Sequence, residues 1–179
     1  AQAHRRSLAE VRRGGLEGLA ARMANEPVAW APDFGLPALH PRAGATVIGA
    51  RFFLVAFNAV LDGGDLAVAR AVARAVRASN GGLAALRAIG VYLPSRARAQ
   101  VSMNLLDYRV TPPAAAYAAV AALAEQAGAR VEASEVVGLV PAAALDGVDP
   151  ADLRLRGDPP GLLLEDRLLR ALTMSKERQ

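Results

Sequence analysis

A long apolar run, AGATVIGARFFLVAFNAVL, lies between Ala43 and Leu61. Its β-branched and aromatic residues disfavour a helix, because such side chains lose rotamer freedom against the preceding helical turn. Two polar side chains, Arg51 and Asn58, interrupt the run. We therefore predict one buried strand from Thr46 to Leu61, with a bulge at Gly49.

The run is preceded by the loop DFGLPALHPRAG, from Asp33 to Gly44. Its glycines allow close backbone approach and its prolines stiffen the chain. Such a loop either presents a ligand site or serves as a rigid connector. If it binds a ligand, His40 and Arg42 are the side chains that could meet a carboxylate.

The composition predicts one domain with an extension, because 179 residues that are 53% hydrophobic suffice for a single core. The absence of cysteine excludes disulfides and thiolate catalysis. No run of eighteen uninterrupted apolar residues occurs and the first residues do not resemble a signal peptide, so we expect a cytoplasmic protein without membrane contact. The formal net charge is +4, and Lys176 is the only lysine. The arginines are dispersed, which favours a small anionic partner over nucleic acid.

Periodicity and turn signals predict the remaining elements. Asp65 is expected to cap one helix, and Thr111, followed by Pro112, a second one. An N-terminal helical pair is expected to begin at Ser7 and to break at Gly14. The predicted order is a strand at 46–61, a helix at 66–79, strands at 89–93 and 99–106, a helix at 112–127 and a strand at 131–137.

This order predicts an α+β fold, the ferredoxin-like βαββαβ sandwich, with a four-stranded antiparallel sheet and both helices on one face. We predict a helical connector and loop segment at 1–45, the sandwich at 46–146 and a C-terminal extension at 147–179. Since the first predicted strand is apolar on both faces, the open face of the sheet should be covered.

Polar residues within the predicted sheet are the candidate ligand contacts. Asn58 and Asn104 lie on the two central strands, where paired amides could bind a heterocycle or could simply satisfy structural hydrogen bonds. Arg51 and Glu135 could pair with each other, face a ligand channel or be ordinary structural or edge charges.

Five ordered segments carry a family resemblance, which extends from about Arg5 to about Leu145. The segments are RRSLAEVRRGGLEGL, WAPDFG, GATVIGARFFLVAFN, QVSMNLLD followed by TP, and EVVGLVP. In these segments the chain resembles the formiminotransferase family, specifically its C-terminal subdomain. The resemblance implies a ferredoxin-like fold and transfer of a formimino group from N-formimino-glutamate to tetrahydrofolate during histidine degradation.

The resemblance also implies folate as the ligand of the loop before the apolar run. The folate-binding residues that it implies are Gly35, Leu36, Pro37, Ala38, Leu39, His40, Pro41, Arg42, Ala43 and Gly44. Arg51, Asn58 and Asn104 are added as ligand contacts. Tetrahydrofolate is the expected co-substrate, and no metal is expected because two histidines without cysteine give no ligand spacing.

The general base of the family is a histidine in the first subdomain, and no segment around His4 or His40 matches it. We therefore predict no catalytic residue in this chain. The chain alone should bind folate weakly or not at all and should have no activity. The expected partner is either the missing N-terminal subdomain or a second copy. Two alternatives stay open: a non-catalytic folate- or anion-binding module, and a dimerisation domain. An RNA-recognition domain is disfavoured, because QVSMNLLD on the third strand carries no aromatic residue.

Overall fold

The structure, a computed structural model, describes residues 2, 4–5, 7–63, 65–157 and 159–176. Parts of the predicted N-terminal and C-terminal segments, at residues 1, 3, 6, 158 and 177–179, therefore lie outside the described residues. The chain divides into two units, Ala1–Arg51 and Phe52–Gln179, and each is described by itself.

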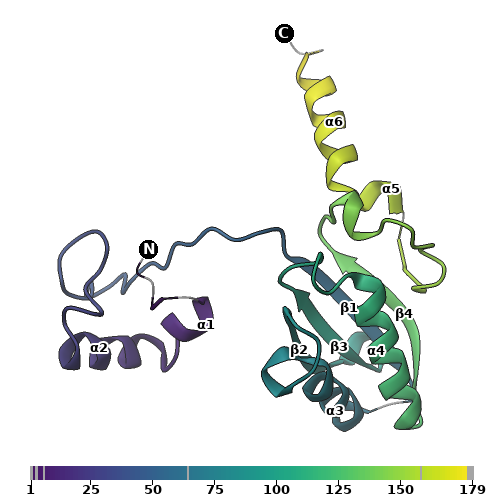
Figure 1. Cartoon of the computed structure of the whole chain (residues 1–179), viewed down its shortest axis with the longest axis horizontal. Coiled ribbons are helices and arrows are strands. Elements are labelled where there is room, and N and C mark those ends of the chain that lie inside the picture. The colour runs from purple at the N-terminus through teal and green to yellow at the C-terminus, as the bar shows by residue number, and fades with distance from the viewer. Residues whose placement is uncertain (1, 3, 6, 64, 158, 177–179) are drawn as a thin grey trace. The chain divides into compact units, whose positions relative to one another are not determined.

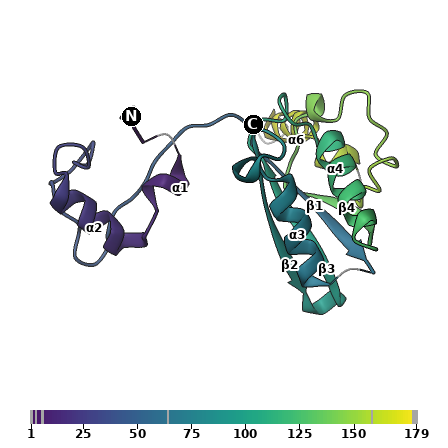
Figure 2. The same ribbon diagram turned by 60° about the horizontal axis from the view of Figure 1, so that its bottom comes forward.

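The second unit contains one four-stranded sheet in the order β2-β3-β1-β4, with every neighbouring pair antiparallel. Helices α3 and α4 both lie on one face of this sheet (Figures 1 and 2). The predicted ferredoxin-like sandwich is confirmed. The elements are β1 (Val55–Asp62), α3 (Leu66–Val76), β2 (Leu86–Leu93), β3 (Arg98–Leu105), α4 (Pro113–Gln126) and β4 (Arg130–Val137).

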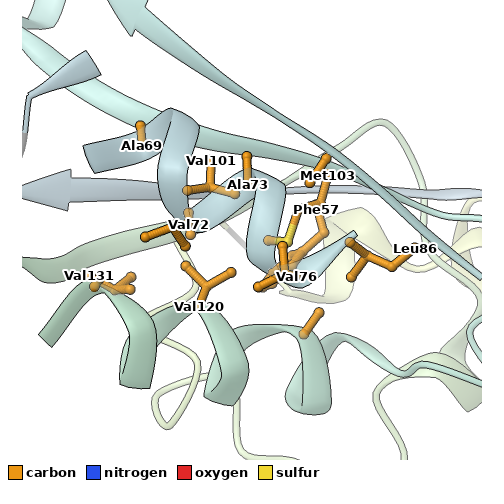
Figure 3. Packing of buried hydrophobic residues seen from close by; sticks show 14 of the residues in the cluster. Phe57, Ala69, Val72, Ala73, Val76, Leu86, Val101, Met103, Val120 and Val131 are labelled. Atoms are coloured by element: carbon orange, nitrogen blue, oxygen red, sulfur yellow. The ribbon is translucent and has the colours of Figure 1, made fainter. Parts of the chain in front are cut away.

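The core lies between the two helices and the sheet (Figure 3). Helix α3 turns a stripe of small and branched side chains inward at helical spacing. It begins as predicted, because the Asp65 side chain accepts a hydrogen bond from the backbone N–H of Val68 at 2.9 Å. The sheet contributes its alternate residues, which are fully buried. The core side chains labelled in Figure 3 include Ala69, Val72, Ala73, Val76, Phe57, Leu86, Val101, Met103, Val120 and Val131.

Strand β1 is shorter than predicted, and the prediction of a strand from Thr46 was wrong. Residues 45–54 form neither helix nor strand. The first pairs of β1 are Val55 with Leu105 and Ala56 with Val137, at the ends of β3 and β4. Beyond these ends no neighbouring strand is available to pair with the backbone, so β propensity alone cannot extend the strand.

The expectation that both faces of the first strand are apolar is confirmed only in part. Val55, Phe57 and Leu61 point into the core, while Asn58 and Val60 lie on the open face. Val60 is apolar and only 1% exposed, so its side chain is covered on this face. The apolar residues at positions 47, 48, 52, 53 and 54, on which the expectation also rested, precede the strand.

Two local predictions differ by position. The irregularity in β1 falls between Val60 and Leu61 rather than at Gly49. Helix α4 begins one residue later than expected, with Pro112 at the cap. The Thr111 hydroxyl instead donates to the carbonyl of Ala84, which ties the start of α4 to the turn before β2.

The first unit contains α1 (Leu8–Val11) and α2 (Gly15–Asn25), neither of which has a buried residue. As predicted, the Ser7 side chain accepts a hydrogen bond from the backbone N–H of Glu10, and the chain breaks at Gly14. Within this unit, the Arg22 guanidinium lies 4.4 Å from the ring centroid of Trp30, in a cation–π contact.

The C-terminal part of the second unit covers the outer edge of β4. The Ser134 hydroxyl donates to the carbonyl of Leu153 at 2.6 Å, and Leu155 forms an isolated bridge with Ser134. Two helices follow, α5 (Pro159–Leu162) and α6 (Leu164–Lys176). No helix within the described residues is long and apolar enough to cross a membrane.

Candidate functional site

The open face of the sheet carries polar side chains from its central strands. The register places Ser102 of β3 beside Asn58 of β1, and Glu135 of β4 on the other side of Asn58. Asn104 lies opposite Ala56, one pair further along the same face. Strand alternation therefore brings four polar residues together on the face opposite α3 and α4.

Asn58 is the centre of a hydrogen-bonded network on this face. It is only 7% exposed, and its Nδ2 donates to Glu135 Oε1 at 3.3 Å. The other carboxylate oxygen of Glu135 accepts a hydrogen bond from Arg96 Nη1, also at 3.3 Å. Arg96 follows β2 in a 3₁₀ turn, whereas Glu135 lies on the opposite edge strand. The Arg96–Glu135 ion pair thus spans the two central strands, β3 and β1. Val60, on the same face of β1 as Asn58, is buried.

Gln100 leaves a buried hydrogen-bond acceptor without a partner. The residue is 5% exposed and lies on the open face, opposite Val60 of β1 and Val91 of β2. Its Oε1 has no hydrogen-bond partner among the described residues. A buried amide oxygen in this condition costs about 1–3 kcal/mol of desolvation, and each such atom in a native structure needs an explanation.

The structure brings the two predicted asparagines onto one face but gives them different surroundings. Asn58 is buried and hydrogen-bonded, as its structural interpretation requires, while Asn104 is exposed. Of the suggested Arg51–Glu135 pair, Glu135 forms an ion pair with Arg96 within the second unit. Arg51 is exposed at the end of the first unit.

An ion-pair cluster lies at the end of the sheet where β1 meets the start of β3. Arg98 Nε donates to Glu132 Oε2 at 2.8 Å, and Arg98 also approaches Asp62 at 3.7 Å. Arg156 donates to the other oxygen of Glu132 at 2.5 Å. The hydrogen bonds and charges of Arg98 and Arg156 lower the pKa of Glu132 below its ordinary value of 4.5, although partial desolvation opposes them. Glu132 therefore stays ionised at neutral pH and pairs with both arginines.

The loop from Gly35 to Gly44 belongs to the first unit and closes on itself. His40 and Gly44 form a bridge in which each backbone N–H donates to the carbonyl of the other, at 3.1 and 2.9 Å. His40 Nδ1 accepts hydrogen bonds from the backbone N–H groups of Ala43, at 2.9 Å, and Arg42, at 3.2 Å. Gly44 has φ +67°, a left-handed conformation that glycine adopts without strain. The loop is thus an ordered turn built around the His40 ring.

Most side chains of this loop are exposed. The backbone of Leu36 accepts a hydrogen bond from Ala38, while the Leu36 side chain is 81% exposed. Arg42 is exposed. The neighbouring Phe34 is 95% exposed. His40, in contrast, uses one ring nitrogen to hold the turn.

Sequence reasoning missed Gln100, Ser102 and Arg96 as members of the open face. A signal for the first two was present, because Gln100, Ser102 and Asn104 alternate with apolar residues in QVSMNLLD. Period two on a half-open sheet predicts that these three share the solvent face. Arg96 gave no local signal, because its partner Glu135 is 39 positions away.

The chemistry of the open face suits hydrogen bonding to a polar, neutral ring system. Amide, hydroxyl and carboxylate groups can each donate to or accept from the edge of a heterocycle. Among the described residues, no group of three or more His, Cys, Asp or Glu side chains is placed to hold a metal ion.

Comparison with known proteins assigns both units. Residues 56–158 match the family model of the formiminotransferase domain, and residues 1–51 match that of the N-terminal subdomain of the formiminotransferase domain. The chain is 41% identical over 152 residues to a glutamate formimidoyltransferase from Streptococcus pyogenes serotype M1, which covers 85% of this chain and 50% of that protein.

Two further relatives show the same relationship. A glutamate formimidoyltransferase from Thermoplasma acidophilum is 40% identical over 145 residues, covering 81% of this chain and 48% of that protein. A formimidoyltransferase-cyclodeaminase from Gallus gallus is 38% identical over 174 residues, covering 94% of this chain and 31% of that protein. The chain thus spans half or less of the length of these curated relatives.

Proposed function

The chain belongs to the formiminotransferase family, and we propose that it forms part of a glutamate formimidoyltransferase. The proposed reaction moves the formimino group of N-formimino-glutamate to tetrahydrofolate, a step of histidine degradation. The observation that carries this proposal is the ordered match of both subdomain models, over residues 1–51 and 56–158, which together include nearly the whole loop and sheet region.

We propose two sets of candidate folate contacts, one within each unit, and each set is argued by itself. The loop Gly35–Gly44 supplies one contact surface, and its exposed Arg42 suits a carboxylate of folate. Asn58 and Asn104 supply amides on the open face of the sheet. Gln100 supports this assignment, because its unpartnered Oε1 is an acceptor that a ligand N–H group could satisfy.

The proposed chemistry needs a proton acceptor as well as positioning. A nitrogen of tetrahydrofolate, N5, attacks the formimino carbon and forms a new C–N bond. The bond from that carbon to the glutamate nitrogen then breaks, glutamate leaves as the amine, and the proton lost from N5 passes through a general base to the leaving nitrogen. Holding the two substrates together supplies the other part of the rate enhancement.

We propose that the general base belongs to the N-terminal subdomain and is neither His4 nor His40. The ring of His40 is committed to the turn through Nδ1, and His4 hydrogen-bonds the carbonyl of Ala29 at 2.8 Å. The 179-residue chain alone is therefore expected to bind tetrahydrofolate without turnover. Its proposed working partner is the histidine-bearing part of that subdomain.

Calorimetric titration of the chain with tetrahydrofolate tests this proposal. Saturable binding that Asn58→Ala and Arg42→Ala both weaken is the expected result, with Arg167→Ala on α6 as a control of the same residue type. A folded chain that does not bind tetrahydrofolate would overturn the assignment of folate contacts to this chain. Release of glutamate by the chain alone would overturn the assignment of the base to another segment.

A further inference from the structure

A basic groove runs beside the edge strand β2, on the helix-covered side of the sheet. Helix α3 approaches β2 so closely that a Cβ at Gly90 would lie 2.3 Å from the backbone nitrogen of Arg70. The groove between them has a volume of about 370 Å³. It is lined by Arg70, Ala73 and Arg74 of α3, by Arg77 just after this helix, and by Ala88, Ile89 and Gly90 of β2.

The three arginines form one positively charged stripe. Arg70 and Arg74 lie four residues apart on one face of α3, about 6 Å along its axis. Arg77 follows directly after the last residue of the helix. Within the part of the chain that the structure describes, none of the three forms an ion pair with a carboxylate. Only Arg77 has a polar side-chain partner there, donating to Asn80 Oδ1 at 2.7 Å. The charge of the groove is therefore open to an external anionic group.

The adjoining strand offers backbone hydrogen bonds as well. β2 is the outermost strand, and its register with β3 is unbroken from Leu86 to Leu93. No strand pairs with its other side among the described residues. The edge carries neither a proline nor a bulge, the devices that commonly block the addition of another strand.

The positive charges of Arg70, Arg74 and Arg77 favour an acidic strand at the β2 edge. In an extended segment, alternate residues lie on the same face about 6.6 Å apart. Acidic residues at every second position would thus match the spacing of the arginine stripe. A second copy of this chain that paired β2 with β2 would instead bring two arginine stripes together, which like-charge repulsion disfavours.

We propose that the β2 edge and the arginine groove form a docking site for an extended acidic segment of a partner protein. The segment adds to the sheet as a fifth strand, and its carboxylates pair with Arg70, Arg74 and Arg77. Main-chain hydrogen bonds supply affinity, and the arginine stripe supplies selectivity for acidic sequences. This site lies on the helix-covered side and is independent of the folate site proposed above.

The test uses a fluorescein-labelled peptide of alternating valine and glutamate, seven residues long, and measures its anisotropy with the full chain. The double change Arg70→Glu and Arg74→Glu is expected to weaken binding at least tenfold, while Arg167→Glu on α6 leaves it unchanged. Both arginines are exposed, so the double variant should fold, and circular dichroism checks this. Equal binding by the double variant would overturn the proposal.

Two control peptides separate strand addition from simple anion attraction. A peptide with lysine in place of each glutamate is expected not to bind. A peptide with proline in place of each valine keeps the charge but cannot pair as a strand, and it too is expected not to bind. Hydrogen exchange should slow at Leu86–Leu93 when the first peptide is bound. Equal binding of the proline peptide, or unchanged exchange in β2, would overturn strand addition.

Discussion

Asn58 Nδ2 lies 3.3 Å from Glu135 Oε1, and the two residues are cross-strand neighbours on β1 and β4. Glu135, on the edge strand β4, also pairs with Arg96, which follows the other edge strand, β2. The buried amide of Asn58 on a central strand is thus linked through Glu135 to both edges of the sheet. The amide is therefore part of the fold as well as a candidate ligand contact, and stability and binding have to be measured together.

Asn58→Ala should lower both properties. Removal of the amide leaves Glu135 without one of its two donors and costs about 1–2 kcal/mol in the free energy of unfolding. Tetrahydrofolate affinity should fall as well. Asn104→Ala is the matched control, because Asn104 is exposed and should affect binding without changing stability. Urea unfolding and calorimetric titration measure the two effects, and equal destabilisation by both variants would contradict the difference in burial.

Unlike Asn58→Ala, Gln100→Leu should lower the affinity for tetrahydrofolate without lowering the free energy of unfolding. The change replaces an unpartnered buried amide oxygen with apolar atoms of similar volume, so the free energy of unfolding should stay constant or rise by up to about 1 kcal/mol. Affinity for tetrahydrofolate should fall about three- to tenfold, the equivalent of one hydrogen bond. Marked destabilisation in urea would show that Gln100 is satisfied within the protein.

Gly90→Ala should be strongly destabilising. The added Cβ would lie 2.3 Å from Arg70 N and 2.5 Å from the carbonyl carbon of Ala69, both backbone atoms that cannot rotate away. Overpacking of this kind costs about 1–3 kcal/mol. Gly49→Ala is the control, since no atom lies within 4 Å of its Cβ position. Thermal unfolding that shifts equally for both variants would be incompatible with the close approach of α3 to β2.

Glu132→Gln should remove an acid-sensitive part of the stability. The neighbouring Arg98 and Arg156 lower the pKa of Glu132 below 4.5 in the folded protein. A lowered folded-state pKa stabilises the fold above the ordinary value, and this contribution is lost as the pH falls from 4.5 through the lower pKa. The variant should thus be less stable than the wild type at pH 7, with the difference shrinking below pH 4.5. Glu125→Gln, at an exposed position of α4, is the control of the same residue type and should be as stable as the wild type at pH 7.

His40→Ala should weaken folate binding by loosening the loop. The change removes the acceptor of two backbone N–H groups, those of Arg42 and Ala43. His40→Gln restores one side-chain acceptor and should recover part of the affinity. Titration with tetrahydrofolate measures both, and a loss in His40→Gln equal to that in His40→Ala would indicate direct ligand contact by the ring rather than support of the turn.

The sequence predicted the order of elements because each boundary has a local cause. Asp65 caps α3 through its own side chain, and Gly14 breaks the N-terminal helices through its backbone conformation. The start of β1 could not be predicted in this way. It depends on where β3 and β4 end, at Leu105 and Val137, and strand pairing over such distances leaves no local mark.

In the candidate site too, some residues could be predicted from local sequence and others depend on contacts between distant segments. The family resemblance singled out the loop, the predicted central strands singled out the two asparagines, and alternation in QVSMNLLD could have added Gln100. The Arg96–Glu135 pair depends on the sheet order, which brings together the turn after β2 and the far edge strand. The comparison also placed residues 1–51 in the N-terminal subdomain of the family, whereas the resemblance had linked most of the chain to the C-terminal one.

The contact of Ser134 with Leu153 has a practical consequence for solubility. It closes the outer edge of β4, so that this side of the sheet offers few backbone groups to other molecules. A version shortened to end near residue 146 would uncover that edge and would also remove Leu153, which is buried, and Leu155, which packs against the core. Such a fragment should self-associate more readily than the full chain, because an unpaired strand edge is exposed.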